Sequence, residues 1–346
     1  MKALVLSGPR RLELCTVPEP DLAPGEIRVG VALAGICGTD VRLFRGTKVI
    51  EYPRIIGHEF AGQIVEVTPE ASPWTEGQRV VVYPMISCGE CYACRVGRRN
   101  ICVRRRTIGY EFDGGFAEHV VVPAAAVSGG NVIAVPAAVS DEEAALSEPA
   151  AAAIQGIRRA GIQTGSEVLI FGAGPIGLAH AQLCRLAGAS TIAISEPQSA
   201  RRTVALDLGI DAVIDPGSES LVERVRDVFG ETGPDTAFID VGVPELVPVA
   251  VGLLRKGGRC VVFAGMAEGS TCQIEPNVIH YREVDLVGSS SSTPALHREI
   301  LSMAEKGDLV LKALLSDVLP LEAWADGFGM KERAAGLKVL LDPRCG

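Results

Sequence analysis

Residues 167–177 of this 346-residue chain read EVLIFGAGPIG, and they decide the fold of its second half. Residues 167–171 form a short apolar run that is typical of a strand buried in a parallel sheet. The glycines that follow have the spacing G-x-G-x-x-G, and residues 175–187 have a helical pattern. A glycine turn between a buried strand and a helix predicts a dinucleotide site, with the pyrophosphate at the helix N-terminus. The predicted binding residues are Gly172, Gly174, Pro175, Ile176 and Gly177.

The ends of the neighbouring strands extend this predicted cofactor site. Glu196 ends the next strand, where a carboxylate accepts hydrogen bonds from the adenosine ribose and repels a 2′-phosphate, so the sequence favours NAD over NADP. Arg201 and Arg202 are the opposing feature, since they could contact a 2′-phosphate; an exposed helix face is the interpretation we favour. At the nicotinamide end, the carboxyl ends of later strands supply Val241, Ala264, Gly265, Ser289 and Ser290.

Strand patterns continue after the glycine turn. Short apolar runs with helical segments between most of them imply a doubly wound parallel sheet of the Rossmann type. The predicted strands cover 191–195, 212–214, 236–241, 260–264 and 285–288.

Residues 1–150 have a different texture, with short alternating runs between Gly and Pro residues that predict a mainly β domain. An Ala-rich helix is predicted over 149–160. We expect the C-terminal tail, with a helix over 294–306 and a strand over 337–341, to return to the first domain. The predicted domains are therefore 1–150 together with 291–346, and 151–290.

Composition excludes two classes of partner. A net charge of −9 argues against nucleic acid and membrane surfaces, which require a basic face. We see neither a secretion signal nor an apolar run of about 18 residues, so we expect a cytoplasmic protein. Six arginines between positions 95 and 106 could form an anion site, although a solvated lobe is the simpler interpretation. They are Arg95, Arg98, Arg99, Arg104, Arg105 and Arg106.

Ten cysteines in such a protein suggest metal binding, and four of them are clustered within residues 88–102. Cys88, Cys91, Cys94 and Cys102 have the spacing C-x2-C-x2-C-x7-C. Four thiolates complete the tetrahedral shell of zinc and leave no position for a substrate, which predicts a structural site. An iron–sulfur cluster is the alternative.

A second set of candidate ligands is dispersed along the chain: Cys37, His58, Glu59 and Glu148. Each of them alone is unremarkable, because a lone cysteine or histidine is usually part of a core. Together they offer a thiolate, an imidazole and a carboxylate, which suits a catalytic zinc that keeps one position for water or substrate.

These motifs, in this order, resemble the medium-chain zinc-dependent alcohol dehydrogenase family over essentially the whole chain. Within it the sequence is most similar to the polyol dehydrogenases, such as sorbitol (L-iditol) dehydrogenase, and to L-threonine dehydrogenase. The grounds are the element around Glu148, which stands in place of a cysteine, and the segment 280–283 that leads into 288–289.

The resemblance implies a GroES-like catalytic domain, a Rossmann domain, two zinc ions per chain, and a homodimer or homotetramer. It assigns Cys37 and His58 as zinc ligands, with one of Glu59 and Glu148 bound directly and the other through water or by ligand exchange. Two departures stand out. Arg42 occupies a position where many relatives have a histidine that conducts protons, and residues 66–73 lack the usual Gly-containing turn.

The implied reaction interconverts a secondary alcohol, in a polyol, cyclitol or amino alcohol, and its ketone. Zinc lowers the pKa of a bound hydroxyl, as it lowers that of bound water to about 7, and hydride passes to the nicotinamide. Thr39 is the candidate proton relay, with a structural hydroxyl as the alternative. Tyr110 and Phe112 either line the substrate pocket or belong to the core.

Three rival functions remain at this point. An NADPH-dependent aldehyde or ketone reductase of the same family is opposed by Glu196. A non-catalytic nucleotide-binding relative would be expected to lack zinc ligands, and here all are present. A nucleic-acid-binding zinc protein is opposed by the acidic net charge.

Overall fold

The computed structural model describes residues 1–345, which divide into two compact units. Unit 1 contains 1–151, 292–307 and the chain from 315 onward, and unit 2 contains 152–291 and 308–314. The sequence prediction assigned all of 291–346 to the first domain. Instead, Asp308–Leu314 lies with unit 2, because the backbone N–H of Val310 donates to Gln182 Oε1 (2.8 Å) and Leu311 is fully buried there.

Unit 2 is built on a six-stranded parallel sheet with the order β13-β12-β11-β14-β15-β16. The two halves start from the central strand β11 and run outward in opposite directions, which is the Rossmann order and confirms the predicted doubly wound fold. The predicted strands are also found, although β14 and β15 end two residues earlier than expected. The strands are β11 (Glu167–Phe171), β12 (Thr191–Ser195), β13 (Ala212–Ile214), β14 (Thr236–Ile239), β15 (Arg259–Val262) and β16 (Asp285–Gly288).

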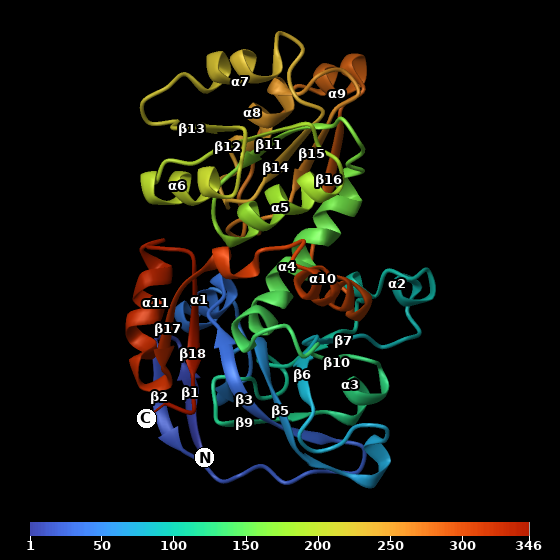
Figure 1. Cartoon of the computed structure of the whole chain (residues 1–346), viewed down its shortest axis with the longest axis vertical. Coiled ribbons are helices and arrows are strands. Elements are labelled where there is room, and N and C mark those ends of the chain that lie inside the picture. The colour runs from blue at the N-terminus through green and yellow to red at the C-terminus, as the bar shows by residue number, and fades with distance from the viewer. Residues whose placement is uncertain (346) are drawn as a thin grey trace. The chain divides into compact units, whose positions relative to one another are not determined.

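Helices cover both faces of this sheet, as right-handed crossovers from a central strand require (Figure 1). α5 (Pro175–Leu186) and α6 (Ser199–Asp207) lie on one face, and α7 (Leu221–Phe229) and α8 (Leu246–Leu253) on the other. A shorter helix, α9 (Pro276–Arg282), precedes β16. The central strands β11, β12 and β14 are buried almost throughout, which explains their continuous apolar runs, whereas the edge strand β16 is largely exposed.

Unit 1 is mainly β, as predicted. Its largest sheet has the order β10-β6-β5-β3-β18-β17, with β9 also paired to β3. β18 is the C-terminal strand and pairs antiparallel with β3, so the tail returns to unit 1. These strands are β3 (Ile27–Gly35), β5 (Glu59–Val67), β6 (Arg79–Val82), β9 (His119–Val122), β10 (Val132–Ala134), β17 (Leu315–Pro320) and β18 (Lys338–Asp342).

The other elements of unit 1 are short strands and helices around this sheet. Strands β1 (Lys2–Gly8), β2 (Arg11–Thr16) and β4 (Arg54–Ile55) form a second sheet, and β7 (Met85–Ile86) pairs with β8 (Arg106–Thr107). The α-helices are α1 (Gly38–Arg45), α2 (Tyr92–Arg95), α3 (Ala124–Ser128), α10 (Pro294–Lys306) and α11 (Trp324–Glu332). The 3-10 turns are η1 (Pro69–Ala71), η2 (Arg99–Ile101) and η4 (Leu321–Ala323), and η3 (Leu311–Leu314) belongs to unit 2.

Helix α4 (Asp141–Ala160) begins eight residues before the predicted start at Pro149. Ser140 and Glu143 form a reciprocal cap: Glu143 Oε2 accepts from the Ser140 N–H (2.9 Å), and Ser140 Oγ accepts from the Glu143 N–H (3.3 Å). Because proline is commonest in the first turn of a helix, the sequence predicts a helix start at Pro149, but this residue lies inside the helix. The correction places Glu148 in the middle of a helix.

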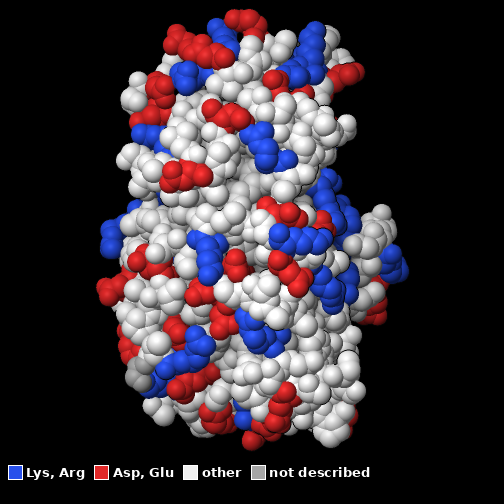
Figure 2. Space-filling view, in the orientation of Figure 1, with Lys and Arg blue, Asp and Glu red and all other residues white. Residues whose placement is uncertain are grey.

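Charge is mixed on the face that Figure 2 shows, where Lys and Arg are interspersed with Asp and Glu. No helix within residues 1–345 has both the length and the apolar character needed to cross a bilayer.

Candidate functional site

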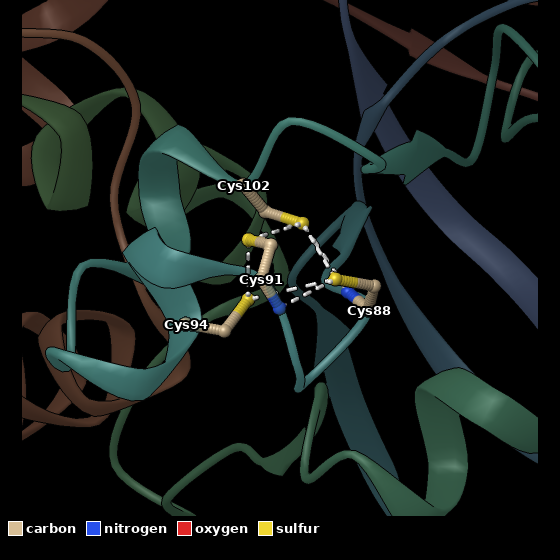
Figure 3. Close-up of side chains that lie close together, drawn as sticks. All are labelled: Cys88, Cys91, Cys94 and Cys102. Carbon is tan, nitrogen blue, oxygen red and sulfur yellow. Dashed lines mark hydrogen bonds between the residues drawn. The ribbon is translucent and has the colours of Figure 1, made fainter.

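The four-cysteine lobe of unit 1 brings its sulfur atoms to the corners of a small tetrahedron (Figure 3). The printed sulfur–sulfur distances are 3.5 Å for Cys91–Cys94 and Cys88–Cys102, 3.8 Å for Cys91–Cys102 and 4.0 Å for Cys88–Cys94. A tetrahedral ion with metal–sulfur bonds of about 2.3 Å would separate its sulfurs by about 3.8 Å. The distances fit one ion bound by all four thiolates, and they are too short for a cluster in which each cysteine binds a different iron.

Local backbone geometry holds these thiolates. Cys88 Sγ accepts from the Cys91 N–H (3.4 Å), and Cys102 Sγ accepts from the Cys88 N–H (3.3 Å). Backbone hydrogen bonds from Glu90 and Cys91 lower the pKa of Cys88 to about 6, which favours the thiolate that a metal requires. The lobe is therefore preformed for a cation.

Five of the six arginines of this lobe contact the rest of the protein, and Arg98 is exposed. Arg104 pairs with Glu90 (2.6 Å), Arg99 Nε donates to Ser87 Oγ (2.7 Å), and Arg106 stacks over Phe112 at 4.7 Å from the ring centroid. Arg95 and Arg105 donate to backbone carbonyls. These contacts favour the interpretation of a solvated structural lobe.

The second ligand set converges in the fold, because ligand atoms of Cys37, His58 and Glu59 all lie within 4.8 Å of one another. Cys37 is the N-cap of α1, and His58 and Glu59 lead into β5. Gly57 makes this turn at φ +97°, where a Cβ would meet the Phe116 ring at 2.7 Å, so only glycine fits. A sulfur, a nitrogen and an oxygen at such spacing form a donor set that fits zinc.

Asp40 organises two of these ligands from the first turn of α1, where it is completely buried. Its Oδ2 accepts from the Cys37 N–H (2.7 Å), and its Oδ1 lies 3.3 Å from His58 Nδ1. Burial lowers the pKa of His58, but Tyr110, Asp40 and Cys37 together raise it well above its ordinary value. The local potential therefore favours a cation, and Nδ1 is oriented so that Nε2 is left for a metal.

Glu59 has a buried partner as well, since the Lys338 ammonium forms an ion pair with its carboxylate. Lys338 lies on β18, is 3% exposed, and also donates to the Ile36 carbonyl (3.3 Å). Burial opposes its charge, but Glu59 and Cys37 raise the pKa of Lys338, so it remains an ammonium. Glu59 is therefore both a candidate ligand and the counter-ion of a buried lysine.

Glu148 is near this group but not part of it. Burial, followed by the charge of Glu59, raises the pKa of Glu148 to about 7. The structure thus brings three of the four predicted ligands into one cluster and leaves Glu148 beside them.

Of the other predicted residues, Tyr110 lies at the cluster, with its ring centroid 5.3 Å from that of His58. Phe112 packs instead under Arg106 and against the core. Thr39 is half-buried in the first turn of α1, and its hydroxyl makes no hydrogen bond to any of residues 1–345. Arg42 is exposed.

In unit 2 the predicted glycine turn has the required geometry. Gly172 has φ +106°, and Gly174 is the N-cap of α5, with Pro175 and Ile176 in its first turn. A Cβ on Gly177 would lie 1.9 Å from the Gly172 carbonyl oxygen, so a side chain there would force the helix away from the strand. The N-terminus of α5 is therefore close to β11 and available for a phosphate.

Glu196 is buried beside this turn, where its Oε2 accepts from the Ala173 N–H (2.8 Å) and its Oε1 from the Gln198 N–H (2.9 Å). Arg201 lies 3.9 Å from the same carboxylate, and Arg202 pairs with Asp215 (2.9 Å). The glutamate is where a ribose-binding carboxylate belongs, and both arginines face acidic partners.

Residues at the carboxyl ends of β14, β15 and β16 lie at the same edge of the sheet as the glycine turn. A Cβ on Gly172 would lie 3.7 Å from Val241 Cβ, and one on Gly242 would lie 2.9 Å from the Gly265 carbonyl oxygen, next to Ala264. Ser289 Oγ is buried and has no hydrogen-bond partner among the described residues, and Ser290 follows it. An orphaned hydroxyl at this edge is suited to a bound polar ligand.

Three site residues escaped the sequence interpretation: Asp40 as the partner of His58, Lys338 as the partner of Glu59, and Lys48, which lies over Tyr110. A lysine inside the otherwise apolar run 337–341 was the one signal that could have pointed to a buried ion pair.

Known protein families match both units. Residues 23–134 match the alcohol dehydrogenase GroES-like domain, and residues 175–306 match the zinc-binding dehydrogenase family. The first match confirms the predicted GroES-like domain.

Curated relatives match most of this chain. The chain is 31% identical to L-galactonate-5-dehydrogenase of Escherichia coli K12, covering 95% of this chain and 94% of the relative. It is 35% identical to L-threonine 3-dehydrogenase of Pyrococcus abyssi over 80% and 78% of the two chains. It is also 29% identical to sorbitol dehydrogenase of Bacillus subtilis, over 99% and 97%.

Solved structures similar to this chain are also dehydrogenases. A zinc-binding dehydrogenase of Sinorhizobium meliloti 1021 bound to NADP is 33% identical, with a TM-score of 0.93 over 99% of both chains. A short chain alcohol dehydrogenase (rspB) of E. coli CFT073 complexed with NADH is 29% identical, with a TM-score of 0.91 over 99% of both. This chain therefore belongs to the zinc-dependent medium-chain alcohol dehydrogenase family, in its polyol and threonine dehydrogenase branch, and is an oxidoreductase that acts on CH–OH groups.

Proposed function

We propose that this protein uses NAD to interconvert a secondary alcohol of a polyol, cyclitol or amino alcohol and its ketone, and that each chain binds two zinc ions. The catalytic ion would be held by Cys37, His58 and a glutamate, either Glu59 or Glu148. The structural ion would be held by the four-cysteine lobe. The observation that carries this proposal is the convergence of thiolate, imidazole and carboxylate within 4.8 Å from residues that are distant in the sequence.

When bound, zinc supplies Lewis acidity that makes an alcohol hydroxyl more acidic, and the nicotinamide supplies a hydride acceptor. The residues of the protein orient the ligands, balance their charge and carry the proton. Asp40 fixes the orientation of His58 and the Cys37 backbone. Lys338 balances the charge of Glu59. Thr39, two residues after Cys37, is the proposed carrier of the hydroxyl proton, which fits a half-buried hydroxyl that makes no hydrogen bond to residues 1–345.

The preference for NAD rests on Glu196. Its carboxylate is buried beside the glycine turn, so a 2′-phosphate would have to approach a negative charge without water between them. Arg201 lies 3.9 Å from Glu196, and this pairing makes it less available to a phosphate. One solved relative holds NADP and another NADH, so the choice depends on this chain's own residues.

We also propose a cytoplasmic homodimer or homotetramer. The free cysteines of the lobe need a reducing compartment to stay available for a metal. The alcohols named for relatives, a sugar acid, an amino acid and a polyol, are the substrate range to test.

The test is a screen of polyols, sugar acids and amino alcohols for reduction of NAD, followed at 340 nm and repeated with NADP. The account expects turnover with a member of this set, loss of turnover after chelation, and recovery on adding zinc. Turnover that survives complete removal of metal would overturn the proposed mechanism.

A further inference from the structure

Lys48 is a cation close to the candidate zinc ligands, and the proposed reaction assigns it no role. Its Nζ lies 3.5 Å from the centroid of the Tyr110 ring, and that ring lies 5.3 Å from the ring of His58. Tyr110 therefore contacts both, and the ammonium is within the span of a short polyhydroxylated carbon chain from the imidazole. Both side chains belong to unit 1.

The position of Lys48 is fixed by the same helix that presents Cys37. α1 has Cys37 as its N-cap and ends at Gly46, a left-handed C-cap with φ 75°. The backbone N–H of Lys48 then donates to the Arg42 carbonyl (3.2 Å), which holds the chain against the last turn of α1. Helix α1 thus carries a candidate metal ligand at one end and an ammonium just past the other.

This ammonium has no counter-ion within the described part of the chain. No carboxylate oxygen of residues 1–345 lies within 4.0 Å of Lys48 Nζ, and the side chain is only half exposed. Burial, followed by the charge of Arg105, lowers the pKa of Lys48 to about 8; Arg42 adds to this effect, while Glu111 and Asp40 oppose it. The ammonium is therefore partly desolvated and, among residues 1–345, unpaired, and a bound anion would stabilise its charge.

A purely structural role explains the position of the Lys48 ammonium poorly. A cation–π contact stabilises the ammonium, but a partly desolvated lysine beside further cations costs free energy unless a negative group binds it. A neutral polyol would leave that charge unmatched. A polyol that has a carboxylate or phosphate at one end would match it.

We propose that Lys48 is a specificity-determining residue that binds the anionic end group of the substrate, and that this enzyme acts on a polyhydroxylated acid or its phosphate counterpart rather than on a neutral polyol. The inference rests on the proposed function, because it assumes that the oxidised hydroxyl lies at Cys37, His58 and a glutamate. It adds the chemical class of the substrate.

The experiment compares stereoisomeric aldohexonates with the alditols that match them, so that each pair differs only in the end group. Lys48→Met removes the charge and keeps the length of the side chain. Because a hydrogen bond to a charged group is at stake, kcat/KM for the acids should fall by about 10-fold to 100-fold, mainly through KM. The alditols should change by less than about twofold. Lys256→Met, at an exposed lysine of unit 2, is the matched control and should change neither.

A set of alditol phosphates separates the two sources of negative charge. If only the phosphates lose kcat/KM in Lys48→Met, the ligand is a phosphate; if only the acids do, it is a carboxylate. Equal loss for neutral and anionic substrates would overturn the inference. So would a displaced pH profile of kcat with unchanged KM, because it would assign Lys48 to proton transfer.

Calorimetric binding of the same probes without NAD separates this inference from the proposed function. Binding of the anionic probe by the native protein, lost in Lys48→Met and kept in Lys256→Met, supports the anion site even if no alcohol is oxidised. Oxidation of alditols with no preference for anionic probes would overturn the anion site and leave the dehydrogenase assignment intact.

Discussion

The two candidate metal centres of unit 1 are built in opposite ways. The four-cysteine lobe takes identical ligands from residues 88–102, and its sulfurs are held by nearby backbone N–H groups. The second centre takes three different ligands from positions 37, 58 and 59, and two of them have charged partners on distant elements or turns. The first centre is thus closed and local, whereas the second is asymmetric and depends on the whole sheet. A structural ion needs only a closed and local site, whereas catalysis needs an asymmetric site.

The largest expected effect is on stability and comes from the lobe. Cys102→Ser should release one ion and destabilise unit 1 by several kcal/mol, lowering Tm by on the order of 10 °C, because metal binding is coupled to folding of the loop. Thermal unfolding with elemental analysis measures both. Cys272→Ser, at an exposed cysteine, is the control. An unchanged Tm would show that the lobe does not depend on metal.

Cys37→Ser should affect catalysis and leave stability unchanged. The protein should fold normally and lose at least about 10³-fold in kcat, because Lewis-acid catalysis contributes several kcal/mol to transition-state stabilisation. Cys15→Ser, at a cysteine on β2, should be neutral. If Cys37→Ser instead lowered Tm as much as Cys102→Ser, the distinction between the two centres would fail.

Lys338→Met tests the dependence of the second centre on the C-terminal strand. Leaving Glu59 buried without its partner should cost about 3 kcal/mol of unfolding free energy in zinc-depleted protein. Denaturant unfolding measures this loss. The double variant Lys338→Met with Glu59→Gln should recover most of it, and a double variant no more stable than the single one would argue against the ion pair.

Asp40→Asn tests whether the orientation of His58 matters. Loss of the charged partner should reduce zinc affinity or kcat by about 10-fold to 100-fold while Tm changes little. Zinc titration by competition with a chelator gives the affinity. Asp326→Asn, at an exposed aspartate on α11, is the matched control. Wild-type affinity and turnover in Asp40→Asn would remove Asp40 from the account.

Thr39→Val should have the smallest effect, a loss of about 10-fold in kcat with zinc content unchanged, if its hydroxyl carries the proton. Thr39→Ser keeps the hydroxyl and should restore most of the rate. Full activity in the valine variant would exclude the relay.

The same contrast explains what the sequence could predict. Spacing alone identified the four-cysteine lobe and the glycine turn, because their geometry is decided within a few residues. The parallel strands of unit 2 were also found, since their apolar runs are continuous. The predicted start of helix α4 is too late, because the prediction does not include the cap formed by Ser140 and Glu143.

Residues that act across the sheet could not be found in this way. Lys338 is more than three hundred positions from Ile36, and only the pairing of β18 with β3 brings it to Glu59. Asp40 is three residues from Cys37, yet its contact with His58 depends on how β5 enters the sheet. Sequence spacing therefore predicted the ligands of the four-cysteine lobe, the family resemblance predicted the dispersed ligands, and tertiary pairing determined the partners of the dispersed ligands.

The most direct test of the two-centre account is zinc content per chain in the native protein, Cys37→Ser, Cys102→Ser and the double variant, measured by elemental analysis. The account predicts two, one, one and no ions, with turnover absent in Cys37→Ser and retained by folded Cys102→Ser. Two ions in Cys37→Ser with normal turnover would contradict the proposed catalytic centre.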